Sequence, residues 1–189
     1  MPPRAERRGS QSDRGFNTVI FETDEEGNGR MPSTKKDLME ESLAGYKEKI
    51  VPVTKTTLRW DKDLIFVGAT EQGYEMEFDA HAQWGCKPME ALLLSLAGCM
   101  AIDMVMILQK MRVQLASFKM DLVGERNPVP PQYYKAIEMV LSIAGKNLDS
   151  WKVDRAVALS HAKYCSVYNT LRKDLEVKVR YVLEEKDPP

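Results

Sequence analysis

One apolar stretch limits what this chain can fold into more than any other: GCKPMEALLLSLAGCMAIDMVMILQKMR, from Gly85 to Arg112. Pro88 stands where a helix could begin, because proline fits the first helical turn. The apolar residues after it surround nearly the whole circumference, which predicts a helix buried on most sides. The 12 residues from Ala91 to Ile102 carry no charge, but a membrane span needs roughly 18–20 such residues. We therefore expect a core helix and no membrane partner.

The composition and the cysteines narrow the class of protein. The 189 residues are 43% hydrophobic and 29% charged, with a net charge of −1, which is typical of a soluble chain. Without an excess of basic residues, binding to nucleic acid is not expected. Three cysteines and two histidines give no C-x-x-C motif and no zinc-finger spacing, so we expect no metal site. The odd, low cysteine count and the absence of an apolar signal-peptide segment predict a cytoplasmic protein.

Polarity divides the chain into two parts. Residues 1–45 are polar, and their only apolar spot is the run from Thr18 to Phe21. Such a segment cannot bury enough apolar surface to offset its ordering entropy, which predicts a disordered N-terminal extension. Residues 46–189 carry the periodic patterns of a folded region and are predicted to form a single α+β domain.

Alternating apolar residues predict strands on both sides of the helix. Before it, KTTLRWDKDLIFVGAT predicts two short strands, and GYEMEFDA predicts a third, half-buried strand in which Tyr74, Met76 and Phe78 share a face. After it, ASFKMDLVGER and YYKAIEMVLSIAGK flank a proline-rich loop and predict a hairpin. A helical segment beginning near Asp149 or Ser150 and the strand LEVKVRYVLEE complete the α+β layout. The apolar helix is too hydrophobic for this layout to cover alone, so we expect an intertwined homodimer.

Two cysteines are candidates for chemistry. Cys99 lies within the apolar helix, and Cys165 lies 66 residues later, just before Ser166. Ser166 is a credible N-cap, and a helix N-terminus beside Cys165 would lower the pKa of its thiol. One thiol on a rigid helix and one at a helix junction suit a peroxidatic and resolving pair. The alternative from the residues alone is that these are buried cysteines acting as small hydrophobic side chains.

The segments around both cysteines resemble a known family. PMEALLLSLAGCMAIDMVMILQKMR and HAKYCSVYNTLRKDLEVKV are similar to the OsmC/Ohr family, the osmotically inducible and organic hydroperoxide resistance proteins, and closest to its YhfA-like branch. The shared pattern is a proline, an acid, an apolar run and a cysteine, followed later by a second cysteine near C-[SP]-V-x-x-x-L. The resemblance covers roughly Thr56 to Val182.

The resemblance implies both an architecture and an activity. The fold would be OsmC-like α+β, with two small antiparallel sheets around two long central helices of an intertwined dimer and active sites at the subunit interface. The activity would be that of a thiol-dependent peroxidase acting on organic hydroperoxides. Cys99 would match the peroxidatic cysteine and Cys165 the resolving one. A dithiol such as a lipoyl group, or another thiol, would reduce the enzyme, and no cofactor is implied.

Two further residues are candidates by resemblance, although each departs from the family pattern. Family members place a glutamate directly after the proline, whereas here Met89 follows Pro88 and the acid is Glu90. Glu90 lies nine residues before Cys99, on the opposite face of an ideal helix, so it would need a bent helix start or would serve the other subunit. The arginine that holds the thiolate in hydroperoxide-reducing members has its candidate here in Arg59.

Other readings of the same residues remain open. Asp103 follows Cys99 by one helical turn, where a carboxylate would raise the pKa of the thiol; we favour a structural role for it, fastening the subunit interface. A non-catalytic dimeric binding protein with the same fold is one alternative function. A cysteine-dependent hydrolase is another, since His161 stands four residues before Cys165. Cys86 is expected to be a loop thiol.

Overall fold

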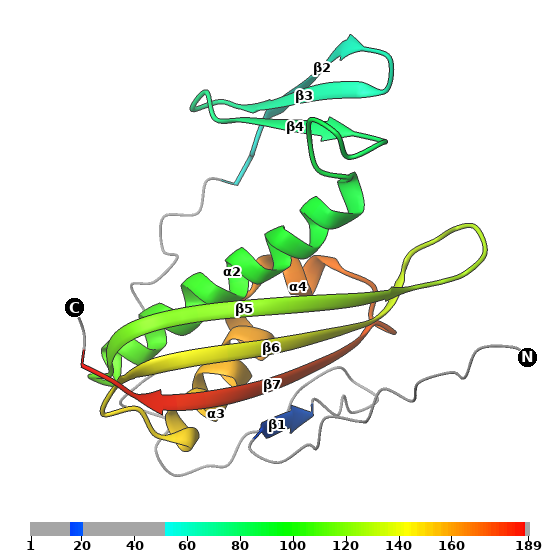
Figure 1. Ribbon diagram of the computed structural model, residues 1–189. Helices are drawn as coiled ribbons and strands as arrows, with labels where there is room; N and C mark the ends of the chain where they lie inside the picture. Colours follow the sequence, from blue (N-terminus) through cyan, green and yellow to red (C-terminus); the bar gives the residue numbers. More distant parts are fainter. Residues whose placement is uncertain (1–15, 21–51, 188–189) are drawn as a thin grey trace, which may run out of the picture.

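The computed structural model describes residues 16–20 and 52–187, which form two separate sheets and a group of helices (Figure 1). The larger sheet has four strands in the order β1-β7-β6-β5. Its strands are β1 (Asn17–Ile20), β5 (Gln114–Arg126), β6 (Tyr134–Lys146) and β7 (Glu176–Glu185). Strands β5 and β6 form the predicted antiparallel hairpin, with Leu141 opposite Met120. The α+β layout with two small sheets is therefore confirmed.

The larger sheet is mixed rather than antiparallel. Strand β7 runs parallel to β6, with Leu141 opposite Tyr181, whereas β1 and β5 are antiparallel to their neighbours. Between β6 and β7 the chain passes through α3 (Ser150–Leu159), η1 (Ser160–Tyr164) and α4 (Ser166–Thr170). A helical crossover of this length returns the chain to the end of the sheet at which β6 begins, so the next strand runs parallel to β6. The prediction of two purely antiparallel sheets is wrong for this pair.

The long helix α2 (Pro88–Lys110) and the shorter helices cover one face of the larger sheet (Figure 1). The core between these layers consists of aliphatic and aromatic side chains with little or no exposure, among them Leu96, Met100, Met104, Ile107, Leu108, Met139, Leu141, Val153, Val157, Val179 and Tyr181. By length and composition α2 is the one helix among the described residues that could cross a membrane. Here its buried face packs against α3, β5 and η1.

The prediction that α2 is buried on most sides does not hold within a single chain. Leu94 and Ile102 are 63% and 60% exposed, and they stand on either side of Gly98 at four-residue intervals. A Cβ built at Gly98 meets nothing within 4 Å. Because residues four apart share a helix face, these three positions form an open apolar stripe along α2.

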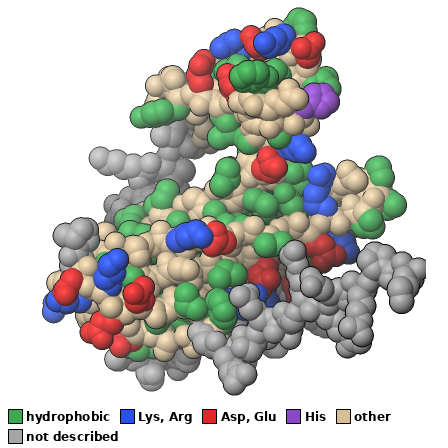
Figure 2. Space-filling model, viewed as in Figure 1, with side chains coloured by type: hydrophobic (Ala, Val, Ile, Leu, Met, Phe, Trp, Pro, Cys, Tyr) green, Lys and Arg blue, Asp and Glu red, His purple; other side chains and the backbone are tan. Residues whose placement is uncertain are grey.

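The smaller sheet is an antiparallel meander of β2 (Thr56–Lys62), β3 (Ile65–Thr70) and β4 (Glu75–Asp79). It stands beyond the N-terminal end of α2 (Figure 1), and hydrophobic side chains are exposed on it (Figure 2). The strands form where expected, but the predicted half-buried face of β4 is not half-buried in the single chain. Tyr74 is 77% and Met76 46% exposed, and only Phe78 is partly covered.

The predicted disorder of residues 1–45 falls mostly outside the described residues. The exception is β1, whose residues pair with β7 from Asn17 opposite Tyr181 to Ile20 opposite Lys178. The apolar run that interrupts the polar extension therefore supplies a fourth strand to the sheet. This strand is a part of the fold that the polar composition of the extension did not predict.

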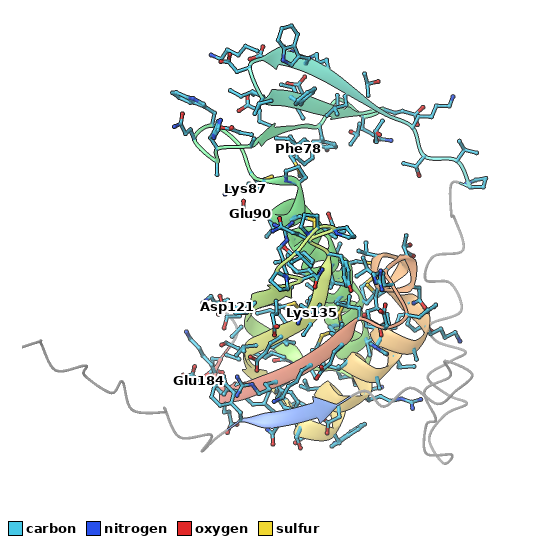
Figure 3. The ribbon with its side chains drawn as sticks, turned by 90° about the vertical axis from the view of Figure 1, so that its right-hand side faces the viewer. Phe78, Lys87, Glu90, Asp121, Lys135 and Glu184 are labelled. Carbon is cyan, nitrogen blue, oxygen red and sulfur yellow. The ribbon has the colours of Figure 1, made fainter. Side chains whose placement is uncertain are left out.

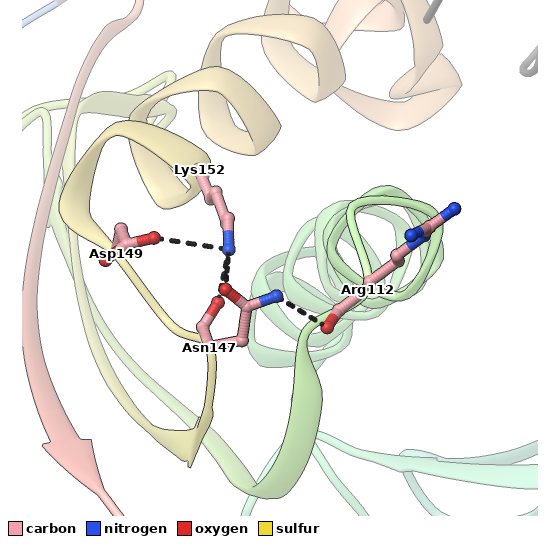
Figure 4. Close-up of polar contacts among 4 residues, drawn as sticks. All are labelled: Arg112, Asn147, Asp149 and Lys152. Atoms are coloured by element: carbon pink, nitrogen blue, oxygen red, sulfur yellow. Dashed lines mark hydrogen bonds and ion pairs between the residues drawn. The ribbon is translucent and has the colours of Figure 1, made fainter.

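A buried lysine joins the C-terminal end of α2 to the start of α3 (Figure 4). Lys152 is 5% exposed, and its Nζ donates to the backbone oxygen and Oδ1 of Asn147 at 2.5 and 2.6 Å and lies 3.2 Å from Asp149 Oδ2. The Asn147 amide in turn donates to the carbonyl of Arg112 at 3.0 Å. This polar cluster holds α3, and the segment that continues from it, in a defined position along α2.

Candidate functional site

The candidate site lies where the junction of η1 and α4 meets the middle of α2. The Cys99 Sγ, the Cys165 Sγ and a carboxylate oxygen of Asp103 all lie within 4.8 Å of one another. Cys99 and Asp103 are one turn apart on α2, and consecutive turns place them on nearly the same face. The structure therefore brings together the two predicted thiols from positions 66 residues apart in the chain.

A wide helical turn delivers Cys165 to this position. Helix α3 continues into the π-helical turn η1, which closes with a hydrogen bond from the Cys165 N–H to the Ser160 carbonyl at 2.8 Å. The chain then turns into α4, for which Cys165 is the N-cap instead of the predicted Ser166. The Tyr168 N–H donates to the Cys165 Sγ at 3.4 Å. Single π-helical turns of this kind are often found at functional sites.

The two thiols have different environments. Cys165 is fully buried, whereas Cys99 is partly exposed. The pKa of the Cys165 thiol is raised to about 12, mainly by burial and also by the neighbouring Cys99 and Asp103, while the N–H of Tyr168 acts to lower it. The predicted lowering of this pKa by the helix N-terminus is therefore wrong in its net direction, because desolvation outweighs one long hydrogen bond from a five-residue helix.

Asp103 is fully buried beside the thiols. Its Oδ2 accepts a hydrogen bond from the Ser160 Oγ at 3.0 Å. This bond connects α2 to η1 within one chain, so this contact of Asp103 is intramolecular. Ser160 was not singled out by the sequence, and a polar residue on the apolar side of the helical segment was the only signal for it.

Glu90 is not part of this cluster. Its Oε2 accepts from the Lys87 N–H at 2.9 Å, which caps the start of α2. Both residues lie at the end of α2 that faces the smaller sheet (Figure 3). Nine residues correspond to about 13 Å along a helix, so the single chain does not bring Glu90 to Cys99.

Arg59 is also outside the cluster. It lies on β2 of the smaller sheet, where its guanidinium is 3.5 Å from a carboxylate oxygen of Glu75 and both side chains are more than half exposed. Cys86 belongs to the loop before α2, where its Sγ approaches the Glu77 carbonyl at 3.7 Å. The structure thus unites Cys99 and Cys165 and leaves the other two predicted catalytic residues apart from them.

His161 packs against the same junction. Its ring stacks on Tyr168 with centroids 4.0 Å apart, and burial lowers its pKa to about 4. An imidazole with so low a pKa is a weak base near neutral pH.

An apolar cavity of about 460 Å³ adjoins the N-terminal half of α2. Its walls include Leu92, Ile137 and Leu171, together with two arginines, Arg126 and Arg172. Leu92 lies seven residues before Cys99, which is two turns along the same helix face. Arg172 stacks over the Tyr133 ring at 4.1 Å and pairs with Asp174 at 2.6 Å. Leu92, on the cavity wall, is thus roughly 10 Å from Cys99 along the helix.

Known proteins share both the sequence and the fold. The model of the OsmC-like protein family matches residues 80–180, more than half of the chain. Protein YhfA of Escherichia coli K12 is 34% identical over 125 residues, which cover 66% of this chain and 93% of that protein. A hypothetical protein from Aquifex aeolicus VF5 matches with a TM-score of 0.63 and 30% identity, over 72% of this chain and 98% of that one.

More distant structures have the same fold. The OsmC-like protein of Mycoplasma pneumoniae matches with a TM-score of 0.62 and 19% identity, over 71% of this chain and 99% of that one. An organic hydroperoxide resistance protein OsmC of Legionella pneumophila matches with a TM-score of 0.50 and 14% identity, over 73% and 99% of the two chains. Taken with the paired thiols on the long helix and the π-helical turn, these similarities confirm the predicted resemblance: the chain belongs to the OsmC-like protein family.

Proposed function

We propose that the protein is a thiol peroxidase that reduces organic hydroperoxides through Cys99 and Cys165. The observation that carries this proposal is the proximity of the two sulfur atoms, within 4.8 Å, combined with their unequal exposure. Cys99 is the accessible thiol and Cys165 the buried one, so Cys99 is the group that meets substrate. Closing the remaining gap to a disulfide bond of about 2 Å requires only a local movement.

The reaction has two steps. In the first, the Cys99 thiolate attacks the terminal oxygen of a hydroperoxide ROOH, the O–O bond breaks, and ROH leaves after protonation, with Cys99 as a sulfenic acid. In the second, the Cys165 sulfur attacks the Cys99 sulfur, the S–O bond breaks and water leaves. An external dithiol, of lipoyl type or another thiol, returns the disulfide to two thiols by exchange.

The apolar cavity beside α2 supports an organic rather than an inorganic peroxide. Its walls are mostly apolar and aromatic, with Arg126, Gln132 and Arg172 as polar members, and such a cavity favours the hydrocarbon part of a substrate. The family also includes proteins named for organic hydroperoxide resistance, such as that of Legionella pneumophila. Leu92, on the cavity wall, lies on the same helix face as Cys99, and we propose that the hydrocarbon part of a substrate is held there.

The proposed working form is a cytoplasmic homodimer with the active sites at the subunit interface. The open stripe of Leu94, Gly98 and Ile102 on α2 supports it, as does the exposed apolar surface of the smaller sheet. A second copy packed on these surfaces would supply the second long central helix. It would also offer a route by which Glu90 and Arg59 of one subunit approach the thiols of the other.

A non-catalytic binding protein is the second candidate function. The cavity of about 460 Å³ favours it, because such a volume accommodates a small ligand without any chemistry at the thiols. The cysteine-dependent hydrolase receives less support. Its base would be His161, whose pKa of about 4 leaves it a poor proton acceptor for a thiol.

The deciding experiment is to oxidise the reduced protein with one equivalent of cumene hydroperoxide and to map its cysteines by peptide mass spectrometry. A Cys86→Ser background removes the loop thiol, which lies outside the cluster. The expected result is a Cys99–Cys165 disulfide within seconds, and its loss in Cys99→Ser. A Cys165→Ser variant should instead accumulate a Cys99 sulfenic acid that dimedone traps. Two thiols left unmodified would exclude the peroxidase and leave the binding protein.

A further inference from the structure

The cavity beside α2 combines apolar walls with two positive charges. Its most buried lining residues are Tyr134, Ile137 and Leu175, each at most 8% exposed. The charged members of the lining are Arg126 and Arg172, and none of the described residues that line the cavity is acidic. A volume of about 460 Å³ falls within the range of roughly 300–1,000 Å³ that small-molecule sites occupy. The lining therefore suits a small ligand that is apolar at one end and negatively charged at the other.

One of the two arginines is already held by its own neighbours. The Nε and Nη2 groups of Arg172 donate to the two carboxylate oxygens of Asp174 at 2.9 and 2.6 Å. Its guanidinium also lies 4.1 Å from the centroid of the Tyr133 ring. Because a carboxylate that accepts both bonds of the guanidinium fork balances its charge, Arg172 serves as part of the wall.

Arg126 is placed differently. It is the last residue of β5 and is exposed, and its Nε donates to the Gln132 carbonyl at 2.7 Å. A guanidinium has five N–H donors, so this bond leaves the four on Nη1 and Nη2. Within the described part of the chain no carboxylate pairs with Arg126. Glu125, its neighbour in the chain, pairs with Lys135 at 3.1 Å, and Glu90 accepts a backbone N–H at the start of α2.

Hydrogen bonds fix the segments that carry these side chains. In the loop between β5 and β6, the Asn127 N–H donates to the Tyr133 carbonyl at 2.8 Å, and the Asn127 amide donates to the Val129 carbonyl at 2.6 Å. The Tyr134 hydroxyl donates to the Met89 carbonyl at 2.8 Å, which ties β6 to α2 across the cavity wall. A ligand therefore meets a site that is already formed, which lowers the entropy cost of binding.

We infer that this cavity binds an organic monocarboxylate. The hydrocarbon tail lies against the apolar walls, and the carboxylate accepts two parallel hydrogen bonds from the Nη1 and Nη2 groups of Arg126. For the substrate class this inference rests on the proposed function, and it makes the substrate an anionic rather than a neutral organic hydroperoxide. As a binding site it does not depend on the thiols, because neither Cys99 nor Cys165 lines the cavity.

Calorimetric titration of the reduced protein with octanoate and with 1-octanol tests the site, since the two probes share a tail and differ in the head group. Octanoate should bind roughly three- to tenfold more tightly, between the effect of an exposed ion pair and that of a charged hydrogen bond. Added salt should weaken the binding of octanoate and not that of octanol, because the charge of the exposed Arg126 is screened.

Variants assign the difference to one side chain. Arg126→Gln should lower the affinity for octanoate to that for octanol and leave octanol unchanged, whereas Arg126→Lys, which keeps the charge but not the fork, should give an intermediate value. Arg112→Gln is the matched control, because this exposed arginine follows the other end of α2, and it should change neither affinity. Leu171→Trp fills part of the cavity and, where circular dichroism shows it folded, should weaken both ligands.

Each remaining outcome decides between the proposals. Equal affinities for the two probes in the parent protein, or an affinity for octanoate that Arg126→Gln leaves unchanged, would overturn the anion site. Binding that appears only after dilution to a monomer would assign the cavity to a second copy and would also overturn it. Cys99→Ser should keep octanoate binding. If octanoate binds through Arg126 while cumene hydroperoxide leaves Cys99 of the parent unmodified, the peroxidase proposal fails alone.

Discussion

The two sheets of this protein use similar alternating sequences and end in opposite environments. In β6 the apolar residues Ile137, Met139 and Leu141 are 2% exposed or less, because they pack in one core with side chains of α2 and α3. In β2 and β4 the residues Leu58, Trp60 and Met76 are 46% to 65% exposed. An alternating pattern therefore identifies the apolar face of a strand, but it does not identify the segment that buries this face.

The thiol pair and the other two candidate residues also differ in which of these two regions they occupy. The thiol pair is built on the covered side, where packing is close enough to hold two sulfurs and a carboxylate together. The two candidates that the single chain leaves apart, Glu90 and Arg59, lie at or in the uncovered region. The proposed second copy would cover this exposed apolar face and would meet the region that holds these two residues.

The largest effect expected from this contrast is on stability. Leu141→Ala removes a fully buried side chain and should lower the free energy of unfolding by about 2–5 kcal/mol. Leu58→Ala, the same change on the exposed sheet, should cost less than about 0.5 kcal/mol in a monomer. Urea unfolding measures both. If a second copy covers the small sheet, the cost of Leu58→Ala grows with protein concentration; a cost that is small and constant at all concentrations would contradict the dimer.

A second prediction concerns the connection between α2 and α3. Lys152→Ala leaves the Asn147 carbonyl and Oδ1 without their buried charged donor, and should cost about 2 kcal/mol, as hydrogen bonds to charged groups do. Lys119→Ala, in an exposed pair with Asp121, is the control and should cost at most a few tenths of a kcal/mol. Thermal unfolding compares them. Equal, small effects would mean that this polar cluster does not hold the two helices together.

The buried Cys165 thiol is expected to make the free energy of unfolding depend on pH. The folded pKa of Cys165 is raised from near 9 to about 12, so its contribution to stability is fully present below pH 9 and is lost as the pH rises towards 12. Relative to Cys165→Ala, the reduced wild type should lose up to about 1.4 kcal/mol per pH unit in that window. Urea unfolding at pH 8, 9 and 10 measures this difference. A constant difference would show that the thiol is not desolvated.

The smallest effect is expected in the loop between β4 and α2. The Asp79 carboxylate accepts from the N–H groups of His81, Gln83 and Trp84 at 2.8, 2.9 and 3.1 Å, and these bonds, that of His81 first, hold its pKa below the usual value. A lowered pKa means that the loop order is present above the ordinary pKa and is lost as the pH falls through the folded one.

Trp84 reports this change by fluorescence once Trp60 and Trp151 are replaced by phenylalanine. Asp79→Asn at pH 7 should reproduce the emission that the parent shows only in acid, with global stability nearly unchanged. An acid transition that persists unaltered in Asp79→Asn would assign it to another group.

Much of the site could be predicted from local patterns. The start of α2 at Pro88, the alternation in β5 and β6 and the thiols on helical segments all depend on residues close in sequence, for which periodicity is a direct guide. The helical settings of Cys99 and Cys165 suggested that they form a pair, and the family resemblance assigned the role of each. Ser160 was missed because a serine in a helix has no distinctive signal until its partner, Asp103, is in place.

Local sequence patterns are enough to predict an α+β chain built on one apolar helix that carries a thiol. The packing of distant segments is what places β7 parallel to β6, buries Cys165 and raises the pKa of its thiol, and brings a carboxylate oxygen of Asp103 within 4.8 Å of both sulfurs. The physical reason is the sequence separation of the residues that interact. Helix and strand periods are set by neighbours a few residues apart, whereas desolvation and contact depend on which distant segments pack together, and no local pattern contains that information.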